Sequence, residues 1–151
     1  MYYLLILVLV VADQASKAYI RSGMMPGDSI PVIAQIFHIT YVQNTGAAFS
    51  ILQNEPLLLK VLPIALIVGI AIYLYRKGQD EHWSLKTALS LIIAGGIGNL
   101  IDRVRFGFVV DFFDFRVFPV FNIADIAVCT GCGFLILYVL FFEKSGKGKI
   151  S

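Results

Sequence analysis

Hydrophobic residues in this sequence gather into four long runs, and polar residues gather between them. The runs cover residues 2–20, 57–75, 83–101 and 120–142. An α-helix needs roughly 20 mostly apolar residues to cross a bilayer, and each run is about that long. We therefore predict a membrane protein of the all-α class, a bundle of four transmembrane helices that forms one domain over residues 1–151.

The composition strengthens this prediction. Hydrophobic residues make up 58% of the 151 residues, charged residues 15%, and the mean hydropathy is +0.82. Soluble globular proteins have about half apolar and a quarter charged residues, so this class is excluded. The apolar stretch 2–12 also resembles part of a signal peptide, but no basic residue precedes it and no small-x-small cleavage site follows it. We expect it to be retained as a helix.

The basic residues do not by themselves decide how the helices are oriented. Six of the twelve lie in plainly hydrophilic sequence, namely Arg76, Lys77, Lys86, Lys144, Lys147 and Lys149. The other six belong to the opposite side, but Lys17, Lys60 and Arg103 among them lie within or at the ends of apolar runs. Cytoplasmic loops are rich in Lys and Arg. We therefore predict that both termini and the loop 76–82 are cytoplasmic.

The segments 21–56 and 102–119 are then extracytoplasmic, and both contain strand-like sequence. Residues 36–43 (IFHITYVQ) and 108–115 (FVVDFFDF) are rich in β-branched and aromatic residues, which favours two short strands beside the bundle. We expect residues 53–56 to contribute to a lid. The Gly- and Lys-rich tail, residues 143–151, is expected to be disordered.

The first predicted helix contains two charged residues. Asp13 follows 11 apolar residues, which places it about 16 Å deep at a rise of 1.5 Å per residue. Lys17 is four positions later, so the two side chains share one face of the helix. We interpret them as a structural ion pair, because paired charges are tolerated inside a membrane.

The third predicted helix ends in GGIGNLIDR, residues 95–103. Glycines at 95, 96 and 98 allow another helix to approach closely. Asn99 and Arg103 are four residues apart and share one face. Two interpretations of Arg103 stay open: its side chain extends to the membrane surface, or its guanidinium binds a carbonyl or phosphate group of a substrate.

Asp125 stands in the apolar segment FNIADIAV, residues 121–128, and also has two interpretations. If Asn122 caps the last helix, Asp125 occupies the third helical position, where a carboxylate stabilises the helix start. Asp111 and Asp114 supply further carboxylates at the same predicted face, and in a strand an offset of three places them on opposite sides. One of them can therefore form a pair with Asp125 that shares a proton and activates water for hydrolysis.

Other hydrolytic sites lack the necessary residues. His38 and His82, the two histidines, are expected on opposite sides of the membrane, and no HExxH or GxSxG motif is present. A zinc site or a serine nucleophile therefore has no support from the sequence. Aspartates remain as the candidate catalytic groups.

Five motifs in order resemble the lipoprotein signal peptidase family, the type II signal peptidases. They are DQASK, NTGAAFS, GGIGNLIDR, VVDFFDF and FNIADIAV, which extend from residue 13 to residue 128. The resemblance implies a bacterial inner-membrane aspartyl endopeptidase, sensitive to globomycin and without metal or cofactor. Its substrate would be a prolipoprotein, cut just before the cysteine that carries a diacylglyceryl group. We further expect the protein to act as a monomer surrounded by membrane lipid, with no nucleic-acid partner.

The same resemblance assigns roles to individual residues. Asp111 and Asp125 correspond to the family's catalytic pair, and Asp13 and Lys17 to its ion pair in the first helix. The positions that line the family's substrate site are Asn44, Gly46, Asn99, Arg103 and Asn122.

A thiol oxidoreductase is the alternative enzyme class. Cys129 and Cys132 form a CxxC motif in the last predicted helix. They are the protein's two cysteines, whereas such a relay needs a second pair, so we interpret them as part of a small-residue packing face with Gly131 and Gly133. A third class, a membrane scaffold or transporter subunit, explains the intramembrane ion pair but not the acids at the outer face.

Overall fold

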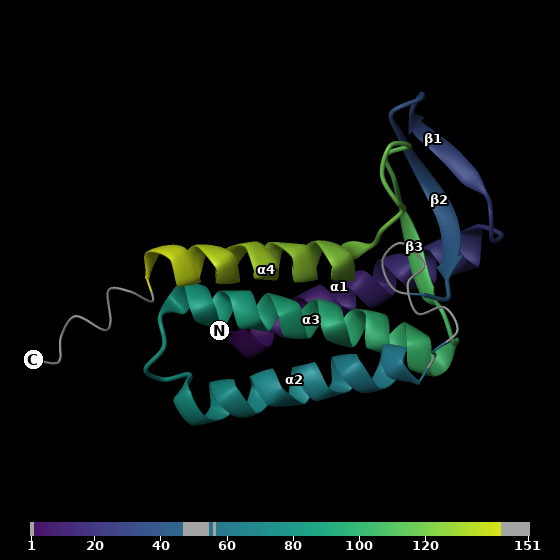
Figure 1. The fold of residues 1–151 in the computed structure, drawn as a ribbon. Coiled ribbons are helices and arrows are strands. Elements are labelled where there is room, and N and C mark those ends of the chain that lie inside the picture. The colour runs from purple at the N-terminus through teal and green to yellow at the C-terminus, as the bar shows by residue number, and fades with distance from the viewer. Residues whose placement is uncertain (1, 47–54, 56, 143–151) are drawn as a thin grey trace, which may run out of the picture.

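The computed structural model of this protein describes residues 2–46, 55 and 57–142. Its helices are α1 (Tyr2–Gly23), α2 (Leu58–Lys77), α3 (Trp83–Arg105) and α4 (Ile123–Phe141). They lie side by side, and a small sheet covers one end of the bundle (Figure 1). All four helices are long and apolar enough to cross a membrane. The predicted class, a four-helix membrane bundle with a small β-containing region, is confirmed. The expected lid residues 53, 54 and 56 and the tail 143–151 lie outside the described residues.

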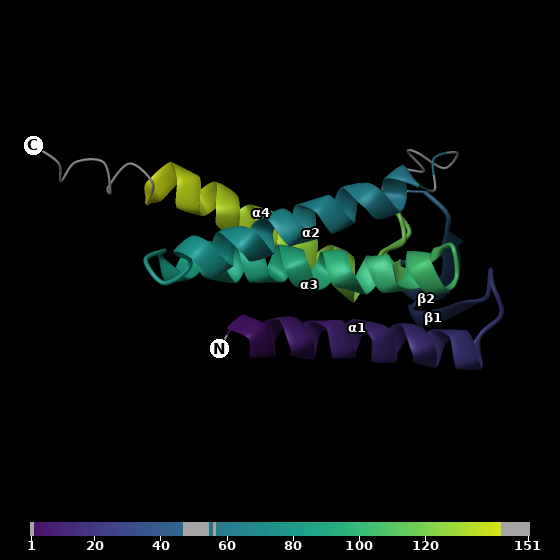
Figure 2. The ribbon, with the colours of Figure 1, turned by 90° about the horizontal axis from the view of Figure 1, so that it is seen from below.

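Helix α3 is the centre of the bundle. It packs against each of the other three helices, and Figure 2 shows it between α1 and α2. Within its most apolar window 56% of the residues are buried, against 11–17% in the other helices. The apolar side chains of α1, α2 and α4 therefore face outward, which suits contact with lipid.

Glycines allow α3 to approach α4 and α1 closely. A Cβ atom at Gly95 would lie 2.2 Å from the backbone oxygen of Ala124, and one at Gly98 would lie 2.6 Å from Oδ2 of Asp13. From α4, a Cβ atom at Gly131 would lie 2.7 Å from the backbone oxygen of Ala88. At these positions the contact leaves no room for a side chain, as expected for small residues between membrane helices.

The predicted packing role of the CxxC motif is wrong for most of its residues. Gly131 is buried against α3, but a Cβ atom at Gly133 would meet nothing within 4 Å. Cys129 and Cys132 are both exposed and carry free thiols. Both cysteines therefore lie outside the helix contact that Gly131 makes.

The sheet is antiparallel, with strand order β1 (Ser29–Ile33), β2 (Phe37–Asn44) and β3 (Val109–Asp114). The two predicted strands differ from β2 and β3 by one residue at each end. Strand β1 was not predicted, because Pro31 interrupts its sequence. A proline is tolerated there because β1 is an edge strand.

Alternation along β3 decides which of its side chains faces the bundle core. Val110 and Phe112 are buried in one hydrophobic cluster with Ile20 of α1 and Tyr41 of β2. Successive side chains in a strand point to opposite faces, so Asp111, which lies between them, points to the other face. Packing of the sheet against α1 thus determines where the Asp111 carboxylate lies.

Candidate active site

Asp111 and Asp125 line the same cavity. Its volume is about 820 Å³, and Asn44, Asn99 and Arg103 line it as well. Asp111 comes from the middle of β3 and Asp125 from the first turn of α4. The structure therefore brings together two carboxylates from different secondary-structure elements.

Asp125 caps its helix and also faces the cavity. Its backbone N–H donates to Oδ1 of Asn122 at 2.9 Å, and its Oδ2 accepts from the Asn122 backbone N–H at 3.1 Å. This is the capping box that the sequence predicted. Its other oxygen, Oδ1, accepts from Nδ2 of Asn99 at 2.7 Å. The capping interpretation and the cavity interpretation of Asp125 are therefore compatible.

Asp111 is held by two asparagine side chains. Its Oδ1 accepts from Nδ2 of Asn122 at 2.7 Å, and its Oδ2 accepts from Nδ2 of Asn44 at 2.9 Å. Asn122 is fully buried and contacts both aspartates, because its oxygen accepts from Asp125 while its amide donates to Asp111. Both carboxylates are thereby held in one arrangement.

Asp114 does not line the cavity. Its Oδ2 accepts from Oγ1 of Thr40 at 2.7 Å and lies 3.0 Å from Nη1 of Arg116. Of the two aspartates in β3, only Asp111 lines the cavity with Asp125, as the offset of three residues predicted.

Arg103 lines the cavity and also has a buried donor. Its Nη2 donates to the backbone oxygen of Gly46 at 3.1 Å, and Gly46 in turn donates from its backbone N–H to Oδ1 of Asn44 at 3.0 Å. Its Nε is buried and has no hydrogen-bond partner among the described residues. A buried donor without a partner costs free energy, so this N–H is suited to receive an oxygen atom of a bound molecule.

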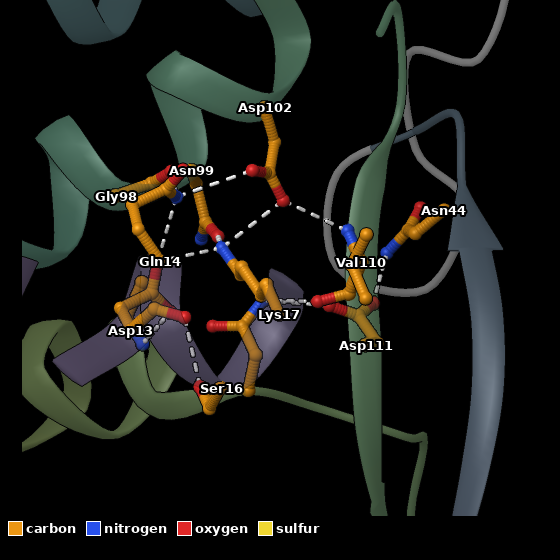
Figure 3. A network of polar contacts seen from close by, with 12 residues as sticks. Asp13, Gln14, Ser16, Lys17, Asn44, Gly98, Asn99, Asp102, Val110 and Asp111 are labelled. Atoms are coloured by element: carbon orange, nitrogen blue, oxygen red, sulfur yellow. Dashed lines mark hydrogen bonds and ion pairs between the residues drawn. The ribbon is translucent and has the colours of Figure 1, made fainter. Parts of the chain in front are cut away.

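A buried cluster of three charged residues, Asp13, Lys17 and Asp102, lies next to the cavity residues (Figure 3). The predicted ion pair forms, with Nζ of Lys17 2.9 Å from Oδ2 of Asp13. The same Nζ lies 3.3 Å from Oδ2 of Asp102 and donates to Oδ1 of Asn99 at 2.9 Å. At most 2% of any of these three charged side chains is exposed.

Sequence reasoning missed Asp102. It lies inside the GGIGNLIDR motif, but the predicted helix ended at residue 101. The helix in fact continues to Arg105, so Asp102 stands on it, three residues after Asn99. The sequence did contain a signal for Asp102. It is an acidic residue that stands three positions after a helical asparagine and next to an arginine.

The rest of the cavity is apolar. Residues of α2, α3 and α4 form its walls, among them Leu62, Leu66, Ile67, Ile92, Ile126 and Val128. The cavity therefore has a polar part at the two aspartates and an apolar part lined by residues of α2, α3 and α4, which suits a ligand with both characters.

The carboxyl group of Asp111 holds its proton more strongly than an ordinary aspartate. Burial raises its pKa to about 6, and the negative charge of Asp125 adds to the rise, although hydrogen bonds from Asn44 and Asn122 oppose it. Burial alone would raise the pKa of Asp114 as well. Hydrogen bonds from Thr40 and Arg116 outweigh this effect, so the pKa of Asp114 is lowered.

These opposite pKa shifts predict that the two asparagine substitutions change stability in different pH ranges. The folded pKa of Asp111 is above its unfolded value of 3.8, so the folded state loses stability as pH rises from about 4 to 6. The loss is about 3 kcal/mol at most, at 1.36 kcal/mol per pH unit. Relative to wild type, Asp111→Asn should therefore become more stable between pH 4 and pH 8, measured by thermal unfolding in detergent.

Asp114→Asn is the matched control for this prediction. Its folded pKa is below the unfolded value, so the wild type gains stability as the pH rises above the folded pKa. This gain is complete above the unfolded value of 3.8, so between pH 4 and pH 8 the stability of the variant relative to wild type should stay nearly constant. If Asp111→Asn changes no more than Asp114→Asn over this range, burial does not raise the pKa of Asp111 in the way described.

The chain matches known proteins over nearly its whole length. Residues 5–141 match the family described as "Signal peptidase (SPase) II". The lipoprotein signal peptidase of Halothermothrix orenii is 45% identical over 146 residues, 97% of this chain and 99% of that protein. The lipoprotein signal peptidase of Clostridioides difficile is 44% identical over 149 residues, again 97% and 99%.

A solved structure has the same fold. It is a bacterial membrane enzyme, determined by the in meso method at 2.3 Å resolution. It is 34% identical, with a TM-score of 0.88, and the match covers 99% of this chain and 93% of that chain. Two carboxylates at one cavity, four membrane-spanning helices and these similarities agree, and the chain belongs to the signal peptidase II family of aspartic-type membrane peptidases.

Proposed function

We propose that this protein removes the signal peptide from prolipoproteins that carry a diacylglyceryl group, cutting just before the lipid-modified cysteine. Its family and the names of its relatives support cleavage of prolipoprotein signal peptides. The observation that carries the finer proposal is the lining of the cavity, in which Asp111 and Asp125 are combined with many apolar residues.

The apolar part of the cavity suits the lipid. Residues of α2 and α4 line it from two sides, and burying an acyl chain there is favourable by about 0.8 kcal/mol for each CH₂ group. The aspartates lie at the sheet end of the bundle. With both termini in the cytoplasm, this end would be at the outer surface of a bacterial membrane, the depth at which a lipid-anchored cysteine places its peptide bond.

In the proposed mechanism the two aspartates share one proton. Asp125, ionised, takes a proton from water while the water oxygen attacks the scissile carbonyl carbon, and Asp111 gives its proton to the carbonyl oxygen. When the tetrahedral intermediate collapses, one hydroxyl returns a proton to the pair, the C–N bond breaks, and the leaving nitrogen takes a proton. The pair again holds one proton.

The neighbouring polar side chains support these steps. Asn99 donates to Asp125, and Asn44 and Asn122 donate to Asp111. These bonds keep both carboxylates in place while the proton moves. The free Nε–H of Arg103 is a donor for a substrate carbonyl. The proposed reaction proceeds without metal or cofactor, in a single chain, and is inhibited by globomycin.

The test compares two precursors that differ only in the lipid. Purified protein in detergent should cleave a diacylglyceryl-modified prolipoprotein and leave the unmodified precursor intact, because the apolar part of the cavity binds the lipid. Mass spectrometry should find the lipid-modified cysteine at the new N-terminus. In water enriched in ¹⁸O, the released signal peptide should gain one ¹⁸O in its new carboxyl group.

Two controls accompany this test. The Asp111→Asn variant should be inactive, which excludes a contaminating protease. The double variant Cys129→Ala, Cys132→Ala should still cleave the lipidated precursor, although Cys129 lines the cavity, because the reaction needs no thiol; this excludes the thiol oxidoreductase alternative. Equal cleavage of both precursors, or a covalent intermediate on any serine or cysteine, would be incompatible with the proposal.

A further inference from the structure

The buried charge cluster of Asp13, Lys17 and Asp102 contacts the backbone next to each candidate catalytic aspartate. Oδ1 of Asp13 accepts from the backbone N–H of Ala124 at 2.9 Å, and Ala124 directly precedes Asp125. Oδ2 of Asp102 accepts from the backbone N–H of Val110 at 3.0 Å, and Val110 directly precedes Asp111. Each carboxylate of the cluster thus holds the residue before one member of the pair.

Lys17 connects these two contacts. Its Nζ lies 2.9 Å from Asp13 and 3.3 Å from Asp102, so one ammonium group links the acid that contacts α4 with the acid that contacts β3. Figure 3 shows Lys17 between the two acids, with Val110 and Asp111 on the neighbouring strand.

A third contact of Lys17 extends to Asp125. Lys17 donates to Oδ1 of Asn99 at 2.9 Å, and Asn99 donates from Nδ2 to Oδ1 of Asp125 at 2.7 Å. An amide whose oxygen accepts from an ammonium must present its NH₂ group on the other side. Nδ2 of Asn122 donates to the same oxygen at 3.0 Å. Lys17 and Asn122 together therefore determine that Asn99 donates to Asp125.

A simple ion pair between helices does not account for this arrangement. One carboxylate is enough to neutralise Lys17, and the second leaves the cluster with a formal charge of −1 in a fully buried place, which is costly. The presence of both carboxylates is explained by their backbone contacts. Asp13 accepts a hydrogen bond from a backbone N–H of α4, and Asp102 accepts one from a backbone N–H of β3. The helix that supplies Asp13 and Lys17, α1, contributes no described residue to the cavity wall.

We propose that Asp13, Lys17 and Asp102 are positioning residues, which set the distance and orientation of Asp111 relative to Asp125 from outside the cavity. This inference rests on the proposed function, because it assumes that the two aspartates react with one substrate. Reacting groups lose about 10²-fold in rate when they are misplaced by about 1 Å. Loss of the cluster should therefore lower kcat and leave substrate binding intact.

The decisive comparison is Asp102→Ala with Asp102→Asn. Alanine removes the oxygen that accepts from Val110, so we expect kcat on the lipidated precursor to fall about 10- to 100-fold, with KM within about twofold of wild type because Asp102 does not line the cavity. Asparagine keeps one acceptor oxygen for Val110, while Gln14, which donates to Oδ1 of Asp102, keeps its bonds to Gly98 and Asp13. The asparagine variant should retain most of kcat.

Hydrogen exchange tests the inference without activity. In Asp102→Ala the amide of Val110 loses its acceptor, so exchange in the β3 peptide should be faster, while exchange at residues 121–126 should stay as in wild type. If Asp102→Ala does not fold, Asp102→Ser, which keeps a polar group in the cluster, is measured in the same way.

Ser90→Ala is the matched control. Ser90 is also fully buried on α3, but among the described residues its hydroxyl bonds only to the backbone oxygen of Lys86, so its loss should lower stability and leave kcat unchanged. A wild-type kcat in Asp102→Ala, or an equal loss in the alanine and asparagine variants, would overturn the inference. A wild type that does not cleave the lipidated precursor would instead overturn the proposed function, and the exchange comparison would then still test the Val110 contact.

Discussion

Asparagine at position 111 or 125 should lower turnover of the lipidated precursor by about 10³-fold or more, since general acid–base groups commonly contribute factors of 10²–10⁴. Asparagine has nearly the same shape as aspartate but neither takes a proton from water nor gives one to a carbonyl oxygen. Both residues line the cavity, but because asparagine fills nearly the same space as aspartate, neither substitution should block substrate binding. Single-turnover cleavage, with binding measured separately, checks this prediction.

Asp114→Asn is the control for chemistry, because Asp114 bonds to Thr40 and Arg116 and does not line the cavity. It should cleave at close to the wild-type rate.

Asp125→Asn tests the other role of Asp125 as well. An asparagine oxygen can still accept from the Asn122 backbone, so the helix cap should weaken by no more than about 1 kcal/mol. If Asp125→Asn cleaves normally but unfolds at a lower temperature, Asp125 is a helix cap only.

Length and apolar content were enough to predict the four helices. An apolar segment that crosses a bilayer must form its backbone hydrogen bonds within the segment, and an α-helix does so. The strands β2 and β3 were predictable from runs of β-branched and aromatic residues. Strand β1 was not, because its five residues include a proline and all are exposed. What makes it a strand is the neighbouring strand β2, which supplies the partner residues.

The sequence left two interpretations of Asp125, and the structure contains the geometry of both. A capping box satisfies backbone groups at the helix start with one carboxylate oxygen, which leaves the other free to face the cavity. A carboxylate at the third position of a helix is therefore not evidence against a role in the site.

The contacts of Asp102 were beyond prediction for a different reason. Its partners are Lys17 in α1, Gln14 in α1 and the backbone of Val110 in β3. No local pattern brings these three segments together, because their proximity depends on how α1, α3 and the sheet pack. Spacing along one helix predicted the contact of Lys17 with Asp13, four residues away, but not the contact with a residue 85 positions later.

Gly95→Ala should lower both stability and activity. The new Cβ atom would lie 2.2 Å from the backbone oxygen of Ala124 and 2.6 Å from Cγ2 of Val128, so α3 and α4 must move apart. Overpacking of this kind costs about 1–3 kcal/mol. Ala124 precedes Asp125, and a shift of about 1 Å at that point should lower the rate of cleavage about 10²-fold. Thermal unfolding in detergent and kcat on the lipidated precursor measure the two effects.

Gly133→Ala separates this contact from the general effect of replacing a helical glycine. A Cβ atom at Gly133 would meet nothing within 4 Å, and alanine favours a helix over glycine by about 1 kcal/mol. This variant should be as stable as wild type or more stable, with unchanged kcat. A Gly95→Ala variant that behaves like Gly133→Ala would mean that α3 and α4 are separated more widely than the structure has them. In that case the contact between these helices would not hold Asp125 in place. Its position would depend on the hydrogen bonds from Asn99 and Asn122 and on the contact of Asp13 with the backbone of Ala124.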